Sequence, residues 1–346
     1  MEEILNNYPN VYQLNKYKKE NTKFINDYKV IRTLSQGKLN KIILCEKDNK
    51  LYVLKKYNKK WLEKKRDFYK NTNNEVILKS KFDDLKTELK ILIDINNEYC
   101  LSCEKIITDY NKIYVLNEYM ENESILKYDE FFFVLDKEES FFIPLAVIKC
   151  IIKNILKSFL YLHKKKNICH RDIKPSNILL SKNGKIKLCD YGESQYMTDK
   201  KIRGTKGTYE FMPPEFFSKE SYYDGEKVDI WSLGICLYAL FYRVLPFNSK
   251  NSLIQLFNDI GKAEIEYHKD RNYFLFQITK KKCNCSNNFL TSEDINFLKC
   301  FLKKNPNERH TSEQALKNNW LNDVNYKYIE DYAEEIYKRK INHSFE

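Results

Sequence analysis

The sequence predicts an α+β protein in which a small antiparallel β-sheet part with one main helix precedes a larger helical part. Three short strand-like segments, "YKVIRTL", "NKIILCEK" and "KLYVLKK", follow one another from residue 28. Beyond residue 140 come two long apolar segments of helical type, "LAVIKCIIKNILKSFLYLHKK" and "VDIWSLGICLYALFYRV". This change in character predicts a boundary between Met120 and Asn122.

The first part is expected to span residues 25–120, after a polar N-terminal extension at 1–24. Tight turns at "SQGKL" and "KDNK" join the three strands, which predicts an antiparallel meander. The Lys/Asn-rich stretch 58–82 is weakly patterned and predicts an insertion. In "DDLKTELKILIDI" the apolar residues recur at helical spacing, and Asp83 or Asp84 is the expected N-cap. "KIYVLNEYM" then predicts a buried strand.

The second part is expected to span residues 121–321. The segment "VDIWSLGICLYALFYRV" is apolar on nearly all faces, which is typical of a helix at the centre of a domain. Residues 250–290 are polar and irregular and predict a second insertion. "TSEDINFLKCFL" and "TSEQALKNNW" each begin with a capping pattern and continue as helices. Residues 322–346 predict a charged amphipathic helical tail.

Composition favours a soluble globular protein. Of the 346 residues, 42% are hydrophobic and 31% charged, and the net charge is +12. The positive excess is spread out, with one dense patch at 55–66, "KKYNKKWLEKKR". A solvated basic insertion explains this patch best, docking of an acidic partner comes second, and nucleic-acid binding third, because no RNA- or DNA-binding signature is present.

The cysteines and the N-terminus favour a reduced, intracellular protein. The start, "MEEILNNYPN", does not resemble a signal peptide, and no apolar run approaches the roughly 18–20 residues of a membrane helix. The pairs Cys100/Cys103 and Cys283/Cys285 are separated by about 180 residues, outside the usual zinc spacings. We therefore expect a cytoplasmic monomer, with the nucleus left open, that binds neither membrane nor nucleic acid.

The most specific string is "HRDIKPSN", residues 170–177. It is followed by "NILLSKNGKIKLCDYG", which predicts two strands joined by an Asn-Gly turn at Asn183 and Gly184. The first string resembles the catalytic loop of eukaryotic protein kinases in its Ser/Thr form, and "DYG" at 190–192 resembles D-F-G. The resemblance implies a bilobal protein kinase fold, with ATP and Mg²⁺ as cofactors and proteins as substrates.

The resemblance implies a role for each residue that matches a kinase motif. Asp172 would accept the proton of the substrate hydroxyl, and Lys174 would neutralise charge on the transferred phosphoryl group. Asn177 and Asp190 would bind Mg²⁺. Lys55, which ends "YVLK", would hold the α- and β-phosphates with Glu88 as its ion-pair partner. Glu98 and Glu104 are weaker candidates for that partner.

The nucleotide site would draw on both parts of the chain. In "YVLNEYM", Glu118 and Met120 would contribute backbone groups to adenine, and Asn117 would be the gatekeeper, with a register shift of one residue left open. "LSQGKLNKI", residues 34–42, aligns with the glycine-rich loop but retains Gly37 alone, with Ser35 and Asn40 at the other glycine positions. The full nucleotide-binding set is Ser35, Gly37, Ile42, Val53, Lys55, Asn117, Glu118, Met120, Asn177 and Cys189.

Further matches extend the resemblance over residues 28–320. In "GTYEFMPPE", Thr208 would contact Asp172 and Lys174, and Glu215 would pair with Arg309 of "NPNERHT". Asp229 would hold the backbone of the catalytic loop from beneath. "SLGICLYALFYRVLPF" and "NPNERHTSEQAL" are similar to the large lobe of the MAP-kinase-kinase group, although the paired Ser/Thr spacing that activates that group is not evident.

Arg171 raises the question of regulation, because kinases with this arginine usually need an anion on the activation segment. Thr205 is the first candidate phosphorylation site and Thr198 the second, which implies an upstream activating kinase. The alternative is that Glu193 or Asp199 satisfies Arg171 and the enzyme is constitutively active. Cys189, on the expected floor of the nucleotide pocket, is either a target for an electrophilic ligand or an ordinary small thiol.

Three functions remain open at this point. An active Ser/Thr protein kinase explains Lys55, Glu88, Asp172, Asn177 and Asp190 together. A pseudokinase or scaffold, binding nucleotide and partners without efficient catalysis, is supported by the glycine-poor loop. A small-molecule kinase of similar fold is disfavoured by "KPSN" and "GTYEFMPPE".

Overall fold

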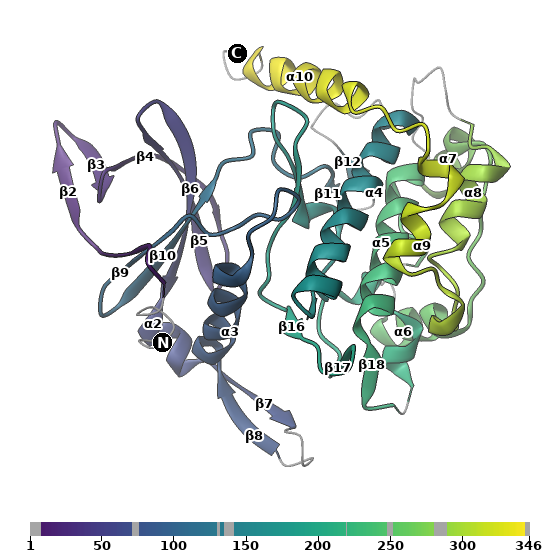
Figure 1. Cartoon of the computed structure of the whole chain (residues 1–346), viewed down its shortest axis with the longest axis horizontal. Helices are drawn as coiled ribbons and strands as arrows, with labels where there is room; N and C mark the ends of the chain where they lie inside the picture. The colour runs from purple at the N-terminus through teal and green to yellow at the C-terminus, as the bar shows by residue number, and fades with distance from the viewer. Residues whose placement is uncertain are drawn as a thin grey trace. The chain divides into compact units, whose positions relative to one another are not determined.

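The computed structural model describes residues 8–70, 76–129, 132–134, 142–218, 220–247, 252–279 and 289–342. The chain divides into two compact units, residues 1–119 and 120–346. Figure 1 shows the helices and strands of each unit, coloured along the chain. The first unit holds most of the strands, and the second holds most of the helices.

An eight-stranded sheet forms the body of the first unit. Its strand order is β1-β9-β10-β6-β5-β4-β3-β2. The strands are β1 (Val11–Gln13), β2 (Lys16–Lys19), β3 (Thr22–Ile25), β4 (Tyr28–Gln36), β5 (Asn40–Lys47), β6 (Lys50–Asn58), β9 (Lys105–Thr108) and β10 (Lys112–Glu118). Two helices, α2 (Lys59–Lys64) and α3 (Lys81–Asp94), and a separate hairpin of β7 (Arg66–Lys70) and β8 (Val76–Ser80) complete the unit.

The sheet curls until its two edges meet. The edge strands β1 and β2 are consecutive in the chain, and only Leu14 and Asn15 connect them. Such a link spans at most about 10 Å, so the two edges must lie close together. Asn26, just after β3, joins them by donating to the Gln13 carbonyl and accepting from the Asn15 N–H, both at 2.9 Å. Apolar residues of six strands fill the interior of the curl: Ile25, Tyr28, Ile43, Cys45, Leu54, Ile107, Tyr114 and Leu116.

The predicted meander is confirmed, since β4, β5 and β6 pair antiparallel in sequence order. The segments expected as an extension (1–24) and an insertion (58–82) also carry secondary structure, because β1 to β3 join the main sheet and α2, β7 and β8 lie within the second segment. The expected N-cap of α3 is wrong. Ser80 caps the helix, and Asp83 is the reciprocal partner in a capping box, hydrogen bonding back to Ser80.

The second unit is mainly helical. Its helices are α4 (Leu145–Phe159), η1 (Leu160–Lys165), η2 (Pro175–Asn177), η3 (Tyr209–Phe211), η4 (Pro214–Phe217), α5 (Gly225–Tyr242), α6 (Leu253–Lys262), α7 (Arg271–Thr279), α8 (Ser292–Lys299), η5 (Pro306–Glu308), α9 (Ser312–Leu316), η6 (Asn319–Leu321) and α10 (Lys327–Asn342). Four short strand pairs accompany them in the described residues: β11 (Lys127–Asp129) with β12 (Phe132–Val134), β13 (Ile168–Cys169) with β16 (Gln195–Tyr196), β14 (Ile178–Leu180) with β15 (Ile186–Leu188), and β17 (Lys201–Arg203) with β18 (Tyr222–Asp224).

The two predicted apolar helices are present and form the core of this unit. All residues of α5 except Lys227 are buried, which agrees with its uniformly apolar sequence. The other long segment starts as α4 and changes at Leu160 into a π-helical turn, η1. The segment 250–290, expected as irregular, contains α6 and α7, and its residues 280–288, which include the C-x-C pair, lie outside the described residues.

The predicted tail helix, α10, packs against α4 (Figure 1). It also packs against the β14–β15 turn. Asn122 donates to the carbonyl of Ala333 at 2.8 Å, and the Asn122 carbonyl accepts from Lys340 Nζ at 2.8 Å. The turn itself needs a glycine, because Gly184 has a φ of 78° and a β-carbon there would lie 2.9 Å from the backbone of Glu330.

Within the described ranges, no helix has both the length and the apolar character needed to cross a bilayer. The cysteines that fall in those ranges are free thiols, and Cys100 and Cys103 are both buried.

Candidate active site

The carboxylate of Asp172 lies in the loop between β13 and η2 of the second unit. Its Oδ1 accepts from the Thr208 backbone N–H at 3.1 Å and from the Thr208 hydroxyl at 2.7 Å. Its Oδ2 accepts from Asn177 Nδ2 at 3.0 Å and lies 2.8 Å from Lys174 Nζ. A carboxylate offers about four lone-pair positions, so protein donors occupy the whole group and hold it in one orientation.

Lys174, Thr208 and Asn177 are connected through this carboxylate. Lys174 Nζ also donates to the Thr208 hydroxyl at 2.8 Å, so Thr208 contacts both residues that the sequence assigned to it. Asn177 Nδ2 additionally donates to the Asp172 carbonyl at 2.8 Å. Because the amide nitrogen is used in this way, the amide oxygen of Asn177 is the atom that can serve as a metal ligand.

Asp229, in the second turn of α5, fixes the backbone of the catalytic loop. Its two carboxylate oxygens accept from the N–H groups of His170 and Arg171, both at 2.8 Å. Its Oδ2 also lies 2.8 Å from Nε2 of His163, which the π-helical turn η1 carries. Burial alone would raise the pKa of Asp229, but these hydrogen bonds and the His163 interaction hold its pKa below the ordinary value. The prediction that Asp229 supports the loop from beneath agrees with this geometry.

Arg171 is buried and donates to neutral acceptors. Its Nη1 donates to Gln195 Oε1 at 2.8 Å and its Nη2 to the Gly204 carbonyl at 2.7 Å. Burial lowers the pKa of its guanidinium, whereas the charge of Glu193 opposes that effect. The carboxylate of Glu193 itself lies 3.4 Å from Lys206 Nζ. The arginine is therefore held by an amide and a peptide group, and sequence reasoning missed both because neither carries a charge.

Close backbone packing at the activation segment requires a glycine at 207. A β-carbon there would lie 2.3 Å from the Arg171 carbonyl oxygen, and the residue has a φ of 120°. This glycine lets the Thr208 N–H approach Asp172. The two candidate phosphorylation sites, Thr205 and Thr198, are both exposed, and Thr205 directly follows the Gly204 carbonyl that accepts from Arg171.

Asp190 and Cys189 follow β15, next to Asn177. The Cys189 N–H donates to the Asn177 carbonyl at 2.9 Å, and its own carbonyl lies 3.1 Å from His170 Nε2. Asp190 has a φ of 66°, which is uncommon for a residue other than glycine and occurs at constrained functional positions. A carboxylate and an amide oxygen fit the ligand preference of Mg²⁺, which takes one or two protein carboxylates together with phosphate oxygens and water. Across the described residues, no group of three or more His, Cys, Asp or Glu side chains forms a metal cluster.

In the first unit, Lys55 and Glu88 form the ion pair that the sequence predicts. Lys55 Nζ, on β6, lies 2.9 Å from Glu88 Oε1, on α3. The hydroxyl of Tyr57 donates to the same oxygen at 2.9 Å. Residues two apart on a strand share a face, so the position of Tyr57 relative to Lys55 was a usable signal that sequence reasoning overlooked. Neither Glu98 nor Glu104 belongs to α3.

The glycine-poor segment forms an ordered hairpin between β4 and β5. Ser35 pairs with Ile42 and Gln36 with Lys41, and the Gly37 N–H donates to the Asn40 carbonyl at 3.0 Å. Asn40 is not among the residues with positive φ, so the turn does not use the left-handed conformation that asparagine tolerates. A β-carbon at Gly37 would meet Asn40 only at ordinary contact distance, 3.5 Å. The hairpin therefore forms without the glycines at positions 35 and 40.

The expected adenine-binding residues lie at the end of β10 and just after it. Asn117 is buried, pairs with Val53 of β6 and donates from Nδ2 to the Ser102 carbonyl at 2.7 Å. The side chain of the expected gatekeeper is thus fixed by a backbone group. Glu118 is half-buried at the end of the strand, and Met120 is buried as the first residue of the second unit.

Glu215 and Arg309 form the predicted buried ion pair in the second unit. Arg309 Nη1 and Nη2 donate to Glu215 Oε1 and Oε2 at 2.7 and 2.6 Å. The three remaining guanidinium donors bond to backbone carbonyls, namely those of Lys303, Lys227 and Lys304. A guanidinium has five N–H donors, so every one of them is satisfied.

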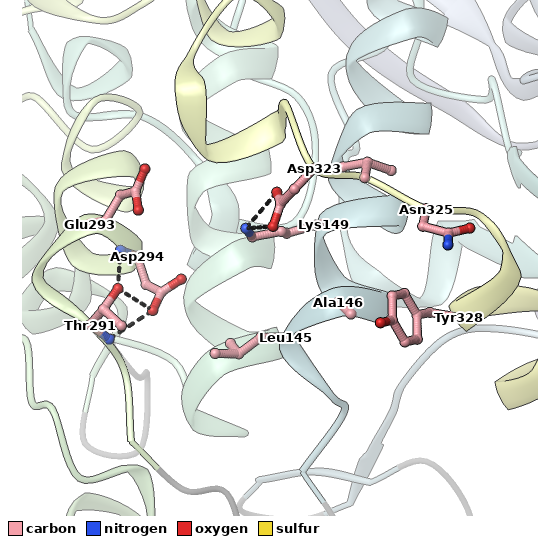
Figure 2. Close-up of a pocket in the computed structure, with 10 residues that line it drawn as sticks. Leu145, Ala146, Lys149, Thr291, Glu293, Asp294, Asp323, Asn325 and Tyr328 are labelled. Carbon is pink, nitrogen blue, oxygen red and sulfur yellow. Dashed lines mark hydrogen bonds and ion pairs between the residues drawn. The ribbon is translucent and has the colours of Figure 1, made fainter.

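A cavity of about 550 Å³ lies elsewhere in the second unit, between the starts of α4 and α8 and the segment before α10 (Figure 2). Lys149 spans part of it and lies 2.9 Å from Asp323. None of the residues that line it belongs to the catalytic loop or to the segment around Asp190.

Comparison with known proteins agrees with this geometry. The family model described as protein kinase domain matches residues 28–321. A probable serine/threonine-protein kinase of Dictyostelium discoideum is 30% identical over 270 residues, which is 76% of this chain and 36% of that protein. A calcium/calmodulin-dependent protein kinase kinase of Caenorhabditis elegans is 31% identical over 265 residues, 70% of this chain and 46% of that protein.

Other relatives bear similar names. Aurora kinase C of Mus musculus is 28% identical over 235 residues, covering 66% of this chain and 74% of that protein. CBL-interacting serine/threonine-protein kinase 20 of Arabidopsis thaliana is 29% identical over 243 residues, 69% of this chain and 48% of that protein. The chain thus spans between a third and a half of the length of several of its relatives. The family model covers most of the chain, and the kinase-like motifs of the chain form the contacts described above. The chain therefore belongs to the protein kinase family, in its serine/threonine branch.

Proposed function

We propose that the chain is an active Ser/Thr protein kinase that transfers the γ-phosphate of ATP to protein hydroxyl groups. The observation that carries this proposal is the Asp172 carboxylate, which Thr208, Asn177 and Lys174 hold in one orientation. A scaffold has no need to orient a carboxylate with that many donors, whereas in-line phosphoryl transfer depends on such positioning. The rival pseudokinase function is supported by the glycine-poor loop.

Lys174 has a second role in this proposal. Its ammonium occupies one acceptor position of Asp172, which a substrate hydroxyl needs for its own proton. A γ-phosphate carries more negative charge than a single carboxylate, so it draws Lys174 away and leaves that position to the substrate. Asp172 then orients the hydroxyl and accepts its proton, and Lys174 stabilises charge on the transferred group.

On the first unit, Lys55 holds the α- and β-phosphates, and Glu88 and Tyr57 hold Lys55 in place. The hairpin at 34–42 covers the phosphates with fewer backbone N–H groups close to them than a full-glycine loop provides. Asn177 and Asp190 supply the oxygen ligands for Mg²⁺, which neutralises phosphate charge when it is bound.

The deciding experiment measures Mg-ATP-dependent phosphate transfer to a generic basic protein, with Asp172→Asn as the control. We expect transfer by the natural chain and loss of at least about a thousandfold in the variant, since the variant cannot accept the proton. A pseudokinase gives nucleotide binding, measured separately by calorimetry, without transfer in either protein. A small-molecule kinase transfers phosphate to an alcohol panel and not to the protein.

Kinship within the family is a finer proposal. The large-lobe strings "SLGICLYALFYRVLPF" and "NPNERHTSEQAL" resemble the MAP-kinase-kinase group. Together with the recurrent Lys and Asn and the string "GTYEFMPPEFF", they also resemble the orphan malaria-parasite kinase called protein kinase 7. We propose a monomer in the cytoplasm or nucleus that acts on proteins and binds neither nucleic acid nor membrane. Phosphorylation of MAP kinases by the purified chain tests the kinship with the MAP-kinase-kinase group. Light scattering on the same sample tests whether the chain is a monomer.

Control by an upstream kinase is proposed for Thr205, with Thr198 second. A phosphate on Thr205 would place negative charge next to the peptide that Arg171 already binds. The neutral acceptors of Arg171 favour the competing proposal, in which activity is constitutive. If phosphatase treatment leaves transfer by the natural chain undiminished, and the Thr205→Ala/Thr198→Ala variant transfers phosphate as fast as the untreated natural chain, activity is constitutive and control at these sites is contradicted.

A further inference from the structure

Five lysines lie together on the inner face of the curled sheet, at one end of its apolar core. Three of them lie on β5, β6 and β10, each two residues from a buried core residue on the same strand. Lys41 therefore shares a face with Ile43, Lys56 with Leu54, and Lys112 with Tyr114. On the β2–β3 hairpin, Lys23 alternates with Ile25, and Lys16 is directly opposite Ile25. We name Lys16, Lys23, Lys41, Lys56 and Lys112 the lysine cluster.

The members of the lysine cluster are neighbours in space. Lys41 is the cross-strand partner of Lys56, and Lys56 is the partner of Tyr114. Lys16 Nζ lies 5.2 Å from the centre of the Tyr114 ring, so the β2–β3 hairpin lies close to the cross-strand row formed by Lys41, Lys56 and Tyr114. Burial, and then the charges of the other four lysines, lower the pKa of Lys56. Lys41, Lys56 and Lys112 are half-buried, so water screens this repulsion only in part.

Within the described part of this unit, the lysine cluster has none of the acidic partners that other lysines have. Lys29 pairs with Glu46, Lys47 with Asp27, and Lys79 with Asp84. Among the residues that the structure describes, no carboxylate lies within 4.0 Å of an ammonium group of the cluster. Like charges directly opposite each other on neighbouring strands destabilise a sheet. An arrangement that is unfavourable for the free protein becomes favourable when a ligand supplies the missing negative charge.

We propose that the lysine cluster binds a small soluble anion that carries several phosphate groups, of the inositol polyphosphate class. The cluster contains lysine and no arginine, and lysine binds phosphate as a point charge, whereas planar carboxylates favour the fork of arginine. A phosphomonoester carries about −1.5 to −2 charges near pH 7, so about three of them balance five ammonium groups within a compact ligand. Ligand sites also occur at the mouths of β-barrels, which a sheet with its two edges close together resembles. This site is separate from Lys55, whose side chain lies on the opposite face of β6.

Titration calorimetry on the full chain with inositol hexakisphosphate tests the proposal, in buffer with a chelator and about 0.1 M salt. The Lys16→Gln/Lys112→Gln variant removes two charges from the lysine cluster and leaves the hairpin at 34–42 intact. Lys50→Gln/Lys60→Gln is the matched control, because it removes two charges from exposed lysines of the same unit. We expect the first variant to bind at least about tenfold more weakly and the control to bind as the natural chain does.

A second cluster variant, Lys23→Gln/Lys41→Gln, and thermal unfolding of all the proteins guard against a folding defect. The ligand is expected to raise the unfolding temperature of the natural chain and of the control, and to have little effect on either cluster variant. Equal weakening in cluster and control variants overturns the proposal, as does loss of binding in Lys55→Met with retention in both cluster variants. Binding to vesicles that carry a phosphoinositide, to a phosphopeptide or to RNA, without binding to the soluble ligand, also overturns it.

Discussion

Replacement of Arg309, even with lysine, should strongly destabilise the second unit. The guanidinium is fully buried and Glu215 is 9% exposed in its side chain. Arginine satisfies five acceptors at once: two carboxylate oxygens and three backbone carbonyls. A lysine has three donors on one nitrogen atom, so it cannot reach all the acceptors that surround the planar guanidinium group. Arg309→Lys therefore leaves at least two buried acceptors without partners, and Arg309→Met leaves the Glu215 charge buried alone.

The expected loss follows from these contacts. Removing one partner of a buried ion pair costs about 3–5 kcal/mol, and each buried acceptor left unsatisfied costs about 1–3 kcal/mol. We expect about 3–5 kcal/mol for Arg309→Met and about 2–4 kcal/mol for Arg309→Lys. With an unfolding entropy near 2.1 cal/mol/K per residue for the unit formed by residues 120–346, 3–5 kcal/mol lowers its melting temperature by about 6–10 °C.

Calorimetric unfolding of the full chain is the assay, together with a double-mutant cycle. Glu215→Gln combined with Arg309→Met should cost less than the two single changes added together, because neither charge is then left alone. Lys338→Met, in an exposed pair with Glu334, is the control and should change stability by only a few tenths of a kcal/mol. A loss below about 1 kcal/mol for Arg309→Met, or strict additivity in the cycle, would refute this account of the pair.

Three further predictions concern nucleotide binding and pH. Tyr57→Phe removes one donor to Glu88 and should lower kcat/KM for ATP by about three- to tenfold, with thermal stability nearly unchanged; an unaltered kcat/KM contradicts the assigned role. Ser35→Gly/Asn40→Gly should lower the KM for ATP by allowing closer backbone approach, and steady-state kinetics that show no change mean that these two substitutions are silent. Burial opposes ionisation of Glu226, but hydrogen bonds from Ser312 and Lys164 lower its pKa to about 2, so its stabilisation is present above about pH 4.5 and is lost as the pH falls toward 2. Acid unfolding of Glu226→Gln should therefore depend less on pH in that window than unfolding of the natural chain.

The pairings in the second unit could be predicted because the resemblance of its motifs to those of protein kinases assigns both partners. Thr208 with Asp172, Glu215 with Arg309, and Asp229 with the catalytic-loop backbone all belong to this class. The Lys55–Glu88 pair was accessible for the same reason. Helices and strands with a clear hydrophobic period were equally predictable.

Contacts that belong to no recognised motif could not be predicted in the same way. Nothing in the sequence indicates that Gln195 and the Gly204 carbonyl hold Arg171, because a backbone carbonyl is present at every residue. The strands between residues 11 and 25 were missed because their stability comes from closing the sheet, a long-range effect absent from local periodicity. The cap of α3 was misplaced because Ser80 and Asp83 are both good capping residues and only the observed pair of hydrogen bonds distinguishes their positions.

The attachment of α10 has a consequence for the synthesis of this protein. Asn122, near the start of the second unit, makes two of its hydrogen bonds with Ala333 and Lys340, and the turn at Gly184 packs against Glu330. The second unit is therefore incomplete until the ribosome has made residue 340. The first unit draws all of its described strands and helices from residues 11–118, so it can fold while the rest of the chain is still being translated. For that interval, the surface of α4 and of the β14–β15 turn that α10 covers in the folded protein is open to solvent.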